Sequence, residues 1–285
     1  YRYALSVHAD EIVSEGLWRR KLGASRTAML FEREGAEVEL GPTLRKLVTA
    51  ARFNPSLPYL SFLCINFDAP VIKEAASWFL DGVFLNYNSS YLERMLEQLL
   101  DEAESPEVTR FLRAVDVRID GFRVEKAPDW RGQRVFVRHE VDGKGYELRL
   151  SEESAGTQKL MGLAAYLMTA LERGATVVVD ELDAKLHPKL LRYVILLFKD
   201  PEVNKSGAQL IFSSQDVSTM RNDVFRRDEI WFAARGEGEA SQLWSLADIH
   251  EANGNLVSKN AAFDKQYLSG RYGADPYLTR IEEWD

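Results

Sequence analysis

Hydrophobic and polar residues alternate along the first 40 positions of the chain. The runs YRYALSVHA, TAMLFERE and EVELG place apolar side chains at every second position, with glycines between the runs. Successive side chains of a strand point to opposite faces, so this period of two predicts antiparallel strands. The basic stretch Leu17–Arg26 is expected to be a solvated hairpin between two of them. We assign residues 1–42 to an antiparallel β part.

Between residues 43 and 115 the period changes to that of helices. YLERMLEQLLDEAE carries apolar residues at i, i+3, i+4, i+7 and i+8. Ser105 followed by Pro106 is typical of an N-cap and the first residue of a helix. DAPVIKEAASWFLDGV predicts a further amphipathic helix that places Trp78 and Phe79 in a core. Residues 43–115 are therefore expected to form a helical insert.

From residue 116 onward the chain returns to strands and then alternates. DGFRVEKA, RVFVRHEV and GYELRL are strand-like, and helix, strand, helix, strand, strand follow from residue 151. This alternation is typical of a layered α/β domain. TVVVDE (residues 176–181) is a continuous β-branched run, as in a strand buried on both faces of a mainly parallel sheet. QLIFSSQD (residues 209–216) is interpreted as another buried strand.

Two adjacent carboxylates, Asp180 and Glu181, end the run TVVVDE. Burial of a carboxylate costs several kcal/mol unless it meets a cation or hydrogen bonds, so the pair calls for an explanation. An acid at the end of such a strand can hold Mg²⁺, and its neighbour can deprotonate an attacking water. The alternative is an acid pair that complements a helix dipole.

The segment SEESAGTQKL (residues 151–160) predicts the start of a long helix. Ser154 can act as its N-cap, and Gly156 and Thr157 open it. A hydroxyl, free backbone N–H groups and the positive end of the helix dipole together make an anion-binding device. An ordinary serine-capped helix is the alternative. The apolar residues in phase along this helix are Leu160, Leu163, Leu167, Met168 and Leu171.

Composition limits the classes of function. The 36 basic and 44 acidic residues give a net charge of -8, which argues against a surface dedicated to nucleic acid but leaves a local basic patch open. Cys64 is the single cysteine; it is interpreted as a small buried apolar residue, and a reducing cytoplasm is expected. The longest apolar stretch, Leu160–Leu171, is shorter than the ~20 residues that span a bilayer, so no membrane segment is expected.

The four segments ESAGTQK, TVVVDE, LDAKLHP and FSSQD together resemble the second half of an ABC-type ATPase head, in the group that includes the SMC, RecF and OLD proteins. In that order, they are similar to the signature motif, the Walker B motif, the D-loop and the switch region. Together with the tail YLSGRYGADPYL, they are similar more narrowly to bacterial AAA-type, ABC-like ATPases of phage-defence (abortive infection) gene pairs. The resemblance implies an α/β fold: an ABC-ATPase-like layered sheet with an antiparallel β subdomain, an inserted helical lid, and residues 116–285 as the C-terminal half of the head.

The resemblance also implies a role for each matching residue. Asp180 would coordinate Mg²⁺, and Glu181 would be the catalytic base. Asp183 to His187 would form the D-loop that crosses a dimer interface, and no metal is expected at His187. The residues implied to contact the γ-phosphate of an ATP held mainly by the partner subunit are Ser154, Gly156 and Thr157.

Two departures from the family pattern stand out. Gln215 occupies the switch position where the family usually has His; glutamine can hydrogen-bond but cannot carry a proton or a positive charge, so slower hydrolysis is expected. No G-x-x-x-x-G-K-[ST] pattern occurs, and DGKGY (residues 142–146) predicts a hairpin turn. We therefore expect the P-loop to lie in a preceding segment of roughly 80–100 residues, and this chain alone to be inactive.

The favoured hypothesis is an ATP-binding and hydrolysing switch that forms a homodimer through an ATP sandwich. It would control a protein effector encoded nearby, a toxin or a nuclease, in anti-phage defence. One alternative is a DNA-repair or chromosome-maintenance head, although long heptads are absent and the net charge does not favour DNA. The other is a degenerate module that binds a partner without turnover, which Gln215 and the missing P-loop would favour.

Overall fold

The computed structural model describes residues 1–48, 52–80, 82–86, 106–115, 119–126, 133–235, 240–251 and 254–274. The chain divides into two compact units, residues 1–82 and 83–285. The expected helix over YLERMLEQLLDEAE, its neighbour Ser105 and the last residues of the tail YLSGRYGADPYL lie outside the described residues.

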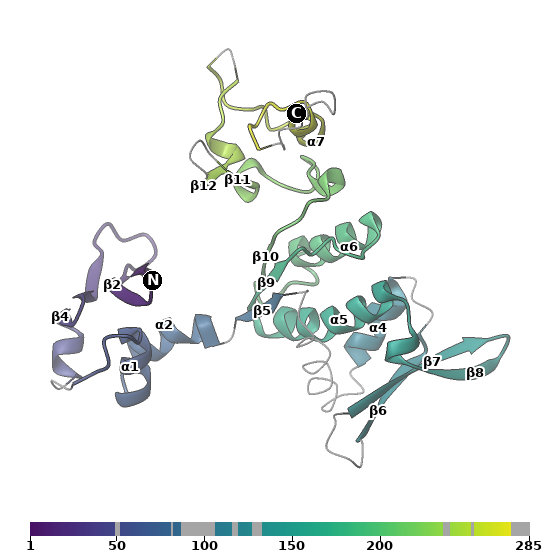
Figure 1. Ribbon diagram of the computed structural model, residues 1–285, viewed down its shortest axis with the longest axis horizontal. Coiled ribbons are helices and arrows are strands. Elements are labelled where there is room, and N and C mark those ends of the chain that lie inside the picture. The colour runs from purple at the N-terminus through teal and green to yellow at the C-terminus, as the bar shows by residue number, and fades with distance from the viewer. Residues whose placement is uncertain are drawn as a thin grey trace, which may run out of the picture. The chain divides into compact units, whose positions relative to one another are not determined.

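A four-stranded antiparallel sheet begins the first unit (Figure 1). Each of its strands pairs with the next in sequence, which confirms the prediction from the period of two. Residues 20–27 between the second and third strands are exposed, as expected of a solvated hairpin, but Leu17 of the predicted stretch Leu17–Arg26 is buried in the second strand. The strands are β1 (Arg2–His8), β2 (Glu11–Arg19), β3 (Ala28–Glu34) and β4 (Glu37–Leu40).

Helical segments complete the first unit: η1 (Leu44–Lys46), α1 (Tyr59–Asn66) and α2 (Pro70–Leu80). Their apolar side chains share one core with Leu17 and Phe31 of the sheet. Cys64 is half-buried at the edge of that core, so it is less enclosed than the sequence suggested.

The prediction that Trp78 and Phe79 lie in a core is wrong. Their side chains are 47% and 41% exposed. Helix α2 buries its first turns instead, and its last turn extends beyond the side chains that form the core. Phe79 there makes an edge contact with Tyr3, with ring centroids 5.5 Å apart. The residues of α2 that are buried are Val71, Ile72, Ala75 and Ala76.

A buried ion pair ties the sheet of the first unit to α1. Arg33 Nη1 lies 3.2 Å from Glu15 Oε2, and both side chains are fully buried. The Glu15 carboxylate also accepts the backbone N–H groups of Tyr59 (2.6 Å) and Leu60 (2.8 Å), so it meets the positive end of the α1 dipole. Arg33 also donates to the carbonyl oxygen of Leu57 at 2.8 Å. Each charge thus has the additional hydrogen bonds that a buried pair requires.

A parallel sheet of order β10-β9-β5 lies in the second unit. Its strands are β5 (Val83–Asn86), β9 (Thr176–Asp180) and β10 (Gln209–Phe212), and β9 runs parallel to both neighbours, as predicted. The prediction that β10 is a buried strand is wrong, because alternate residues are exposed and Ile211 is 51% accessible. Within the described ranges β10 pairs on one side only, with β9.

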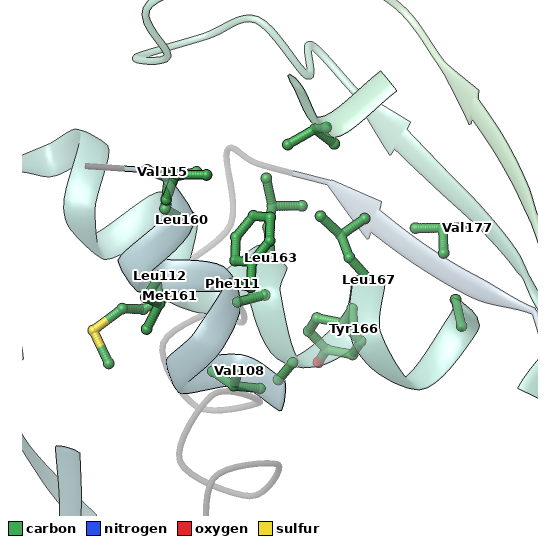
Figure 2. Close-up of a cluster of buried hydrophobic side chains, with 14 of the residues drawn as sticks. Val108, Phe111, Leu112, Val115, Leu160, Met161, Leu163, Tyr166, Leu167 and Val177 are labelled. Atoms are coloured by element: carbon green, nitrogen blue, oxygen red, sulfur yellow. The ribbon is translucent and has the colours of Figure 1, made fainter. Parts of the chain in front are cut away.

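The main core of the second unit surrounds α5 (Ala155–Arg173). Figure 2 shows Phe111 of α4 (Pro106–Ala114) beside Leu163 of α5, and Leu112 beside Met161. Helix α6 (Pro188–Lys199) also contributes to this core. The predicted apolar phase of α5 is confirmed. The predicted insert spanned 43–115, whereas the compact units divide at residue 82 and place β5 and α4 in the second unit.

The rest of the second unit consists of antiparallel strands and short helices. The β7–β8 turn has positive φ at Asp142 (52°) and Gly143 (72°), which is a type I′ hairpin, so DGKGY is a turn as predicted. Among the described residues, no helix is both long and apolar enough to cross a membrane. The remaining elements are β6 (Gly121–Lys126), β7 (Gln133–Val141), β8 (Lys144–Arg149), η3 (Leu150–Glu152), η4 (Val217–Thr219), η5 (Arg227–Glu229), β11 (Trp231–Arg235), β12 (Ser241–Ser245), η6 (Leu246–Asp248) and α7 (Phe263–Leu268).

Replacement of Arg33 by methionine should lower the free energy of unfolding of the first unit by about 3–5 kcal/mol, because it leaves the Glu15 carboxylate buried without its cation. Urea unfolding followed by tryptophan fluorescence measures the loss. Arg45→Met is the matched control, since its pair with Glu39 is exposed, and it should change stability little. Equal small effects of the two substitutions would contradict the role given to the buried pair.

Candidate functional site

The ends of β9 and β10 are tied together by one serine side chain. Ser213 Oγ donates to Asp180 Oδ1 at 2.5 Å and accepts the backbone N–H of Glu181 at 2.7 Å. The backbone of Ser213 continues the parallel pairing, because its N–H donates to Val179 O (3.1 Å) and its carbonyl accepts from Leu182 N (3.0 Å). Ser213 therefore fixes the position of both acidic residues at the carboxyl edge of the sheet.

The turn of residues 181–185 that follows β9 has an unusual backbone. Glu181 (φ 51°) and Lys185 (φ 63°) both occupy the left-handed region, although neither is glycine. Such residues cost of order 1–3 kcal/mol each and persist only where the surroundings hold them. Inside the turn, Ala184 N donates to Glu181 O at 3.0 Å, and Leu186 N donates to Asp183 O at 2.9 Å.

The buried side chain of Lys159, in α5, binds the backbone of this turn. Its Nζ donates to the carbonyl oxygens of Glu181 (3.0 Å), Leu182 (3.0 Å) and Ala184. Lys159 is only 7% exposed. Burial lowers the pKa of Lys159 to about 8, and the negative charge of Asp183 partly opposes this shift. Three carbonyl acceptors match the three N–H donors of an ammonium group, so the buried charge is compensated.

The N-terminus of α5 lies against the same turn. Ser154 caps the helix as predicted: its Oγ accepts the N–H of Thr157 at 3.1 Å and lies 2.9 Å from Thr157 Oγ1. A Cβ added to Gly156 would stand 3.0 Å from the carbonyl oxygen of Lys185, so a larger residue would press on the turn. The first turn of α5 and the 181–185 turn are therefore in direct contact.

Gln215 and His187 make separate contacts beside the turn. The backbone N–H of Gln215 lies 3.3 Å from both carboxylate oxygens of Asp183, so this contact joins the end of β10 to the turn after β9. His187 is the N-cap of α6, and its Nδ1 accepts the N–H of Lys189 at 3.2 Å. The ranges that the structure describes contain no cluster of three or more His, Cys, Asp or Glu residues able to hold a metal ion.

The structure places most of the predicted site residues on one edge of the parallel sheet. Sequence reasoning missed two residues that hold them there, Ser213 and Lys159. Ser213 follows β10 directly, as the first of two hydroxyl residues. Lys159 interrupts an apolar stripe of α5, because Leu163, Tyr166 and Ala170 follow it at i+4, i+7 and i+11 and are buried. The predicted residues that these contacts bring together are Ser154, Gly156, Thr157, Asp180, Glu181, Asp183 and Gln215, whereas the side-chain hydrogen bond of His187 is to Lys189 of α6.

Comparison with known proteins gives one family match. The family described as "AAA domain, putative AbiEii toxin, Type IV TA system" matches residues 52–221, which is more than half of the 285-residue chain. The matched range contains every predicted site residue. No curated protein sequence matches the chain.

Two solved structures are similar at low identity. The SMC head domain from Thermotoga maritima is 15% identical with a TM-score of 0.41, over 83% of this chain and 74% of that one. A structure described under "Structural biochemistry of ATP-driven dimerization and DNA stimulated activation of SMC ATPases" is 16% identical with a TM-score of 0.38, over 54% of this chain and 88% of that one.

Replacement of Ser213 by alanine should loosen the edge without unfolding the sheet. A hydrogen bond of this kind contributes about 1 kcal/mol, so hydrogen exchange at the Glu181 amide should become roughly fivefold faster. Ser214→Ala is the control, because Ser214 Oγ accepts from the Asp216 amide instead. Unchanged exchange at Glu181 in Ser213→Ala would show that the bridge does not hold the turn.

Proposed function

This chain belongs to the family of AAA domains described for AbiEii toxins of Type IV toxin–antitoxin systems, and from that membership we propose that it acts as an ATP-binding and hydrolysing dimeric switch. The membership makes it an AAA-type ATPase domain. One observation supports the proposal of a dimeric switch. Asp180 and Glu181, the N-terminus of α5 and the strained 181–185 turn lie together at one edge of a parallel sheet. Ligands of α/β sheets bind at the carboxyl ends of the strands.

Asp180 fits a magnesium ion that is shared with nucleotide phosphates. Its side chain is exposed at the end of β9, and Ser213 orients one carboxylate oxygen. Mg²⁺ is usually held by one or two carboxylates together with waters and phosphate oxygens, rather than by an all-protein cage. A single oriented carboxylate at this edge is therefore a suitable donor, and the ion would neutralise phosphate charge there.

Glu181 is proposed as the general base. It follows Asp180 directly, and its backbone is fixed on both sides, by Ser213 at its N–H and by Lys159 at its carbonyl. From this fixed backbone, the carboxylate would accept the proton of a water that attacks the γ-phosphate. General-base catalysis of this kind is typically worth about 10²–10⁴-fold in rate.

The N-terminus of α5 is proposed to contact the γ-phosphate. The helix has 19 residues, and its first N–H groups, with the Ser154 and Thr157 hydroxyls, form a positive helix end suited to an anion. The resemblance to ABC-type heads implies that this phosphate belongs to an ATP held mainly by a second copy of the protein. We therefore propose a homodimer that closes through two nucleotides, with Asp183 and His187 in the D-loop between the copies.

The family description places its members in a toxin–antitoxin context. We propose that closure and opening of the dimer control a protein effector encoded nearby, a toxin or a nuclease, in anti-phage defence. A cytoplasmic location is proposed with it, because the single Cys64 forms no internal disulfide. Gln215 at the switch position would make the closed state long-lived, since its amide can orient a water but cannot donate a positive charge.

Replacement of Glu181 by glutamine in the full-length gene product should reduce ATP turnover at least 100-fold and accumulate an ATP-bound dimer, because the amide keeps the shape but cannot accept a proton. Phosphate release and light scattering measure the two effects. Glu202→Gln, at an exposed position outside the site, is the control and should leave both unchanged. Full turnover in Glu181→Gln would exclude the base assignment.

Replacement of Ser154 by aspartate tests the phosphate contact separately. Aspartate is a good N-cap, so α5 should remain folded, but its charge would repel the γ-phosphate. ATP-dependent dimerisation, followed by light scattering in the Glu181→Gln background, should weaken at least tenfold. Ser151→Asp adds the same charge three residues earlier and should have little effect. Equal dimerisation of the two variants would rule out Ser154 as a phosphate contact.

A further inference from the structure

Lys159 connects the first turns of α5 to the turn that carries Glu181. It lies five residues after Ser154, and its ammonium donates to three carbonyl oxygens of the 181–184 segment. We propose that Lys159 is a positioning residue. It holds the backbone of Glu181 in place, and it shifts that backbone when a phosphate binds at Ser154. This inference rests on the proposed function, and it links the proposed phosphate contact at Ser154 to the proposed base Glu181.

The backbone around Glu181 depends on side chains from two other elements. Its N–H is bound by Ser213 Oγ and its carbonyl by Lys159 Nζ, while its φ of 51° is one that non-glycine residues rarely adopt. With both flanking peptide groups held, the direction in which the Cα–Cβ bond of Glu181 leaves the backbone is set. Release of either bond would let the residue relax toward an ordinary conformation and turn its carboxylate away.

The path from Ser154 to Lys159 is short and stiff. Both belong to the first turns of one α-helix, so a shift of the capped end moves the buried ammonium with it. The carbonyl of Lys185 approaches Gly156 closely, which gives the helix end a second contact with the same turn. On its other side the helix start is held by Glu153, whose carboxylate lies 2.6 Å from His139 Nε2 of β7.

The chemistry of the contact favours lysine over other long side chains. An ammonium has three N–H donors that diverge from one point, and the three carbonyl oxygens surround that point. Methionine has similar length but no donor. Arginine keeps the positive charge, yet its donors lie in one plane and point outward as a fork, so it can satisfy only part of the set.

The test compares Lys159→Met, Lys159→Arg and Lys205→Met in the full-length gene product. Lys205 is exposed and outside the site, so its variant controls for loss of a lysine charge. We expect kcat to fall at least 20-fold in Lys159→Met, with the dissociation constant for ATP within threefold of the parent. Lys159→Arg should recover part of the rate, and Lys205→Met should match the parent.

A parental kcat in Lys159→Met would overturn the inference. An equal loss of ATP binding and turnover would also overturn it, because that result indicates a merely structural role. Absence of ATP turnover in the parent would instead refute the proposed function, so the two failures are distinguishable.

Hydrogen exchange tests the link without any change at Lys159, in case the variants do not fold. In the Glu181→Gln protein, ATP should slow exchange at the first turn of α5 and also at the amides of Ala184 and Leu186, which are bonded within the turn. The two sets of amides should respond at the same nucleotide concentration. A response confined to α5 would show that the turn does not follow the helix, and would overturn the inference.

Discussion

Three backbone carbonyl groups are removed from solvent in the turn that follows β9, and the buried ammonium group of Lys159 donates a hydrogen bond to each of them. An unsatisfied buried polar group costs about 1–3 kcal/mol, so the carbonyls of Glu181, Leu182 and Ala184 would together oppose this backbone. Lys159 removes that cost and places its own charge among oxygen atoms. Left-handed residues stand at both ends of the turn, and one of them, Glu181, accepts directly from Lys159.

The topology of the sheet determines what else can reach this turn. Because β9 and β10 are parallel, their carboxyl ends meet at one edge, and Ser213 comes to lie beside Asp180 although 33 positions separate them. The same geometry sets the backbone of Gln215 against Asp183. Helix α5 precedes β9 in the chain, and its N-terminal turn lies against Lys185 of the 181–185 turn at the same edge. The site is thus a consequence of parallel pairing plus one helix that buries nearly all of its apolar face.

Local patterns were sufficient to predict most elements and the positions of the candidate residues. The period of two in the first 40 residues, the β-branched run before Asp180 and the serine before α5 each depend on a few neighbouring residues, and the structure confirms them. The errors concern partners that are distant in sequence. Exposure of Trp78 depends on where the core under α2 ends, and exposure of Ile211 depends on which strands flank β10. The sequence pattern gives Lys159 no role, because the acceptors of a lysine in an apolar stripe come from the turn packed against it.

The departure at Gln215 illustrates how positioning and chemistry are separated in this site. What joins the end of β10 to Asp183 is the backbone N–H of Gln215, and any residue except proline provides that group. A histidine at this position would therefore leave the position of Asp183 intact, and under the proposed function it would change only what the side chain offers to a nucleotide. A site assembled from backbone contacts, with Ser213 and Lys159 as its fixed side-chain supports, can change its rate at residue 215 without losing its geometry. By the same reasoning, a substitution at Lys159 acts on the geometry itself, because its ammonium binds the backbone of the turn directly.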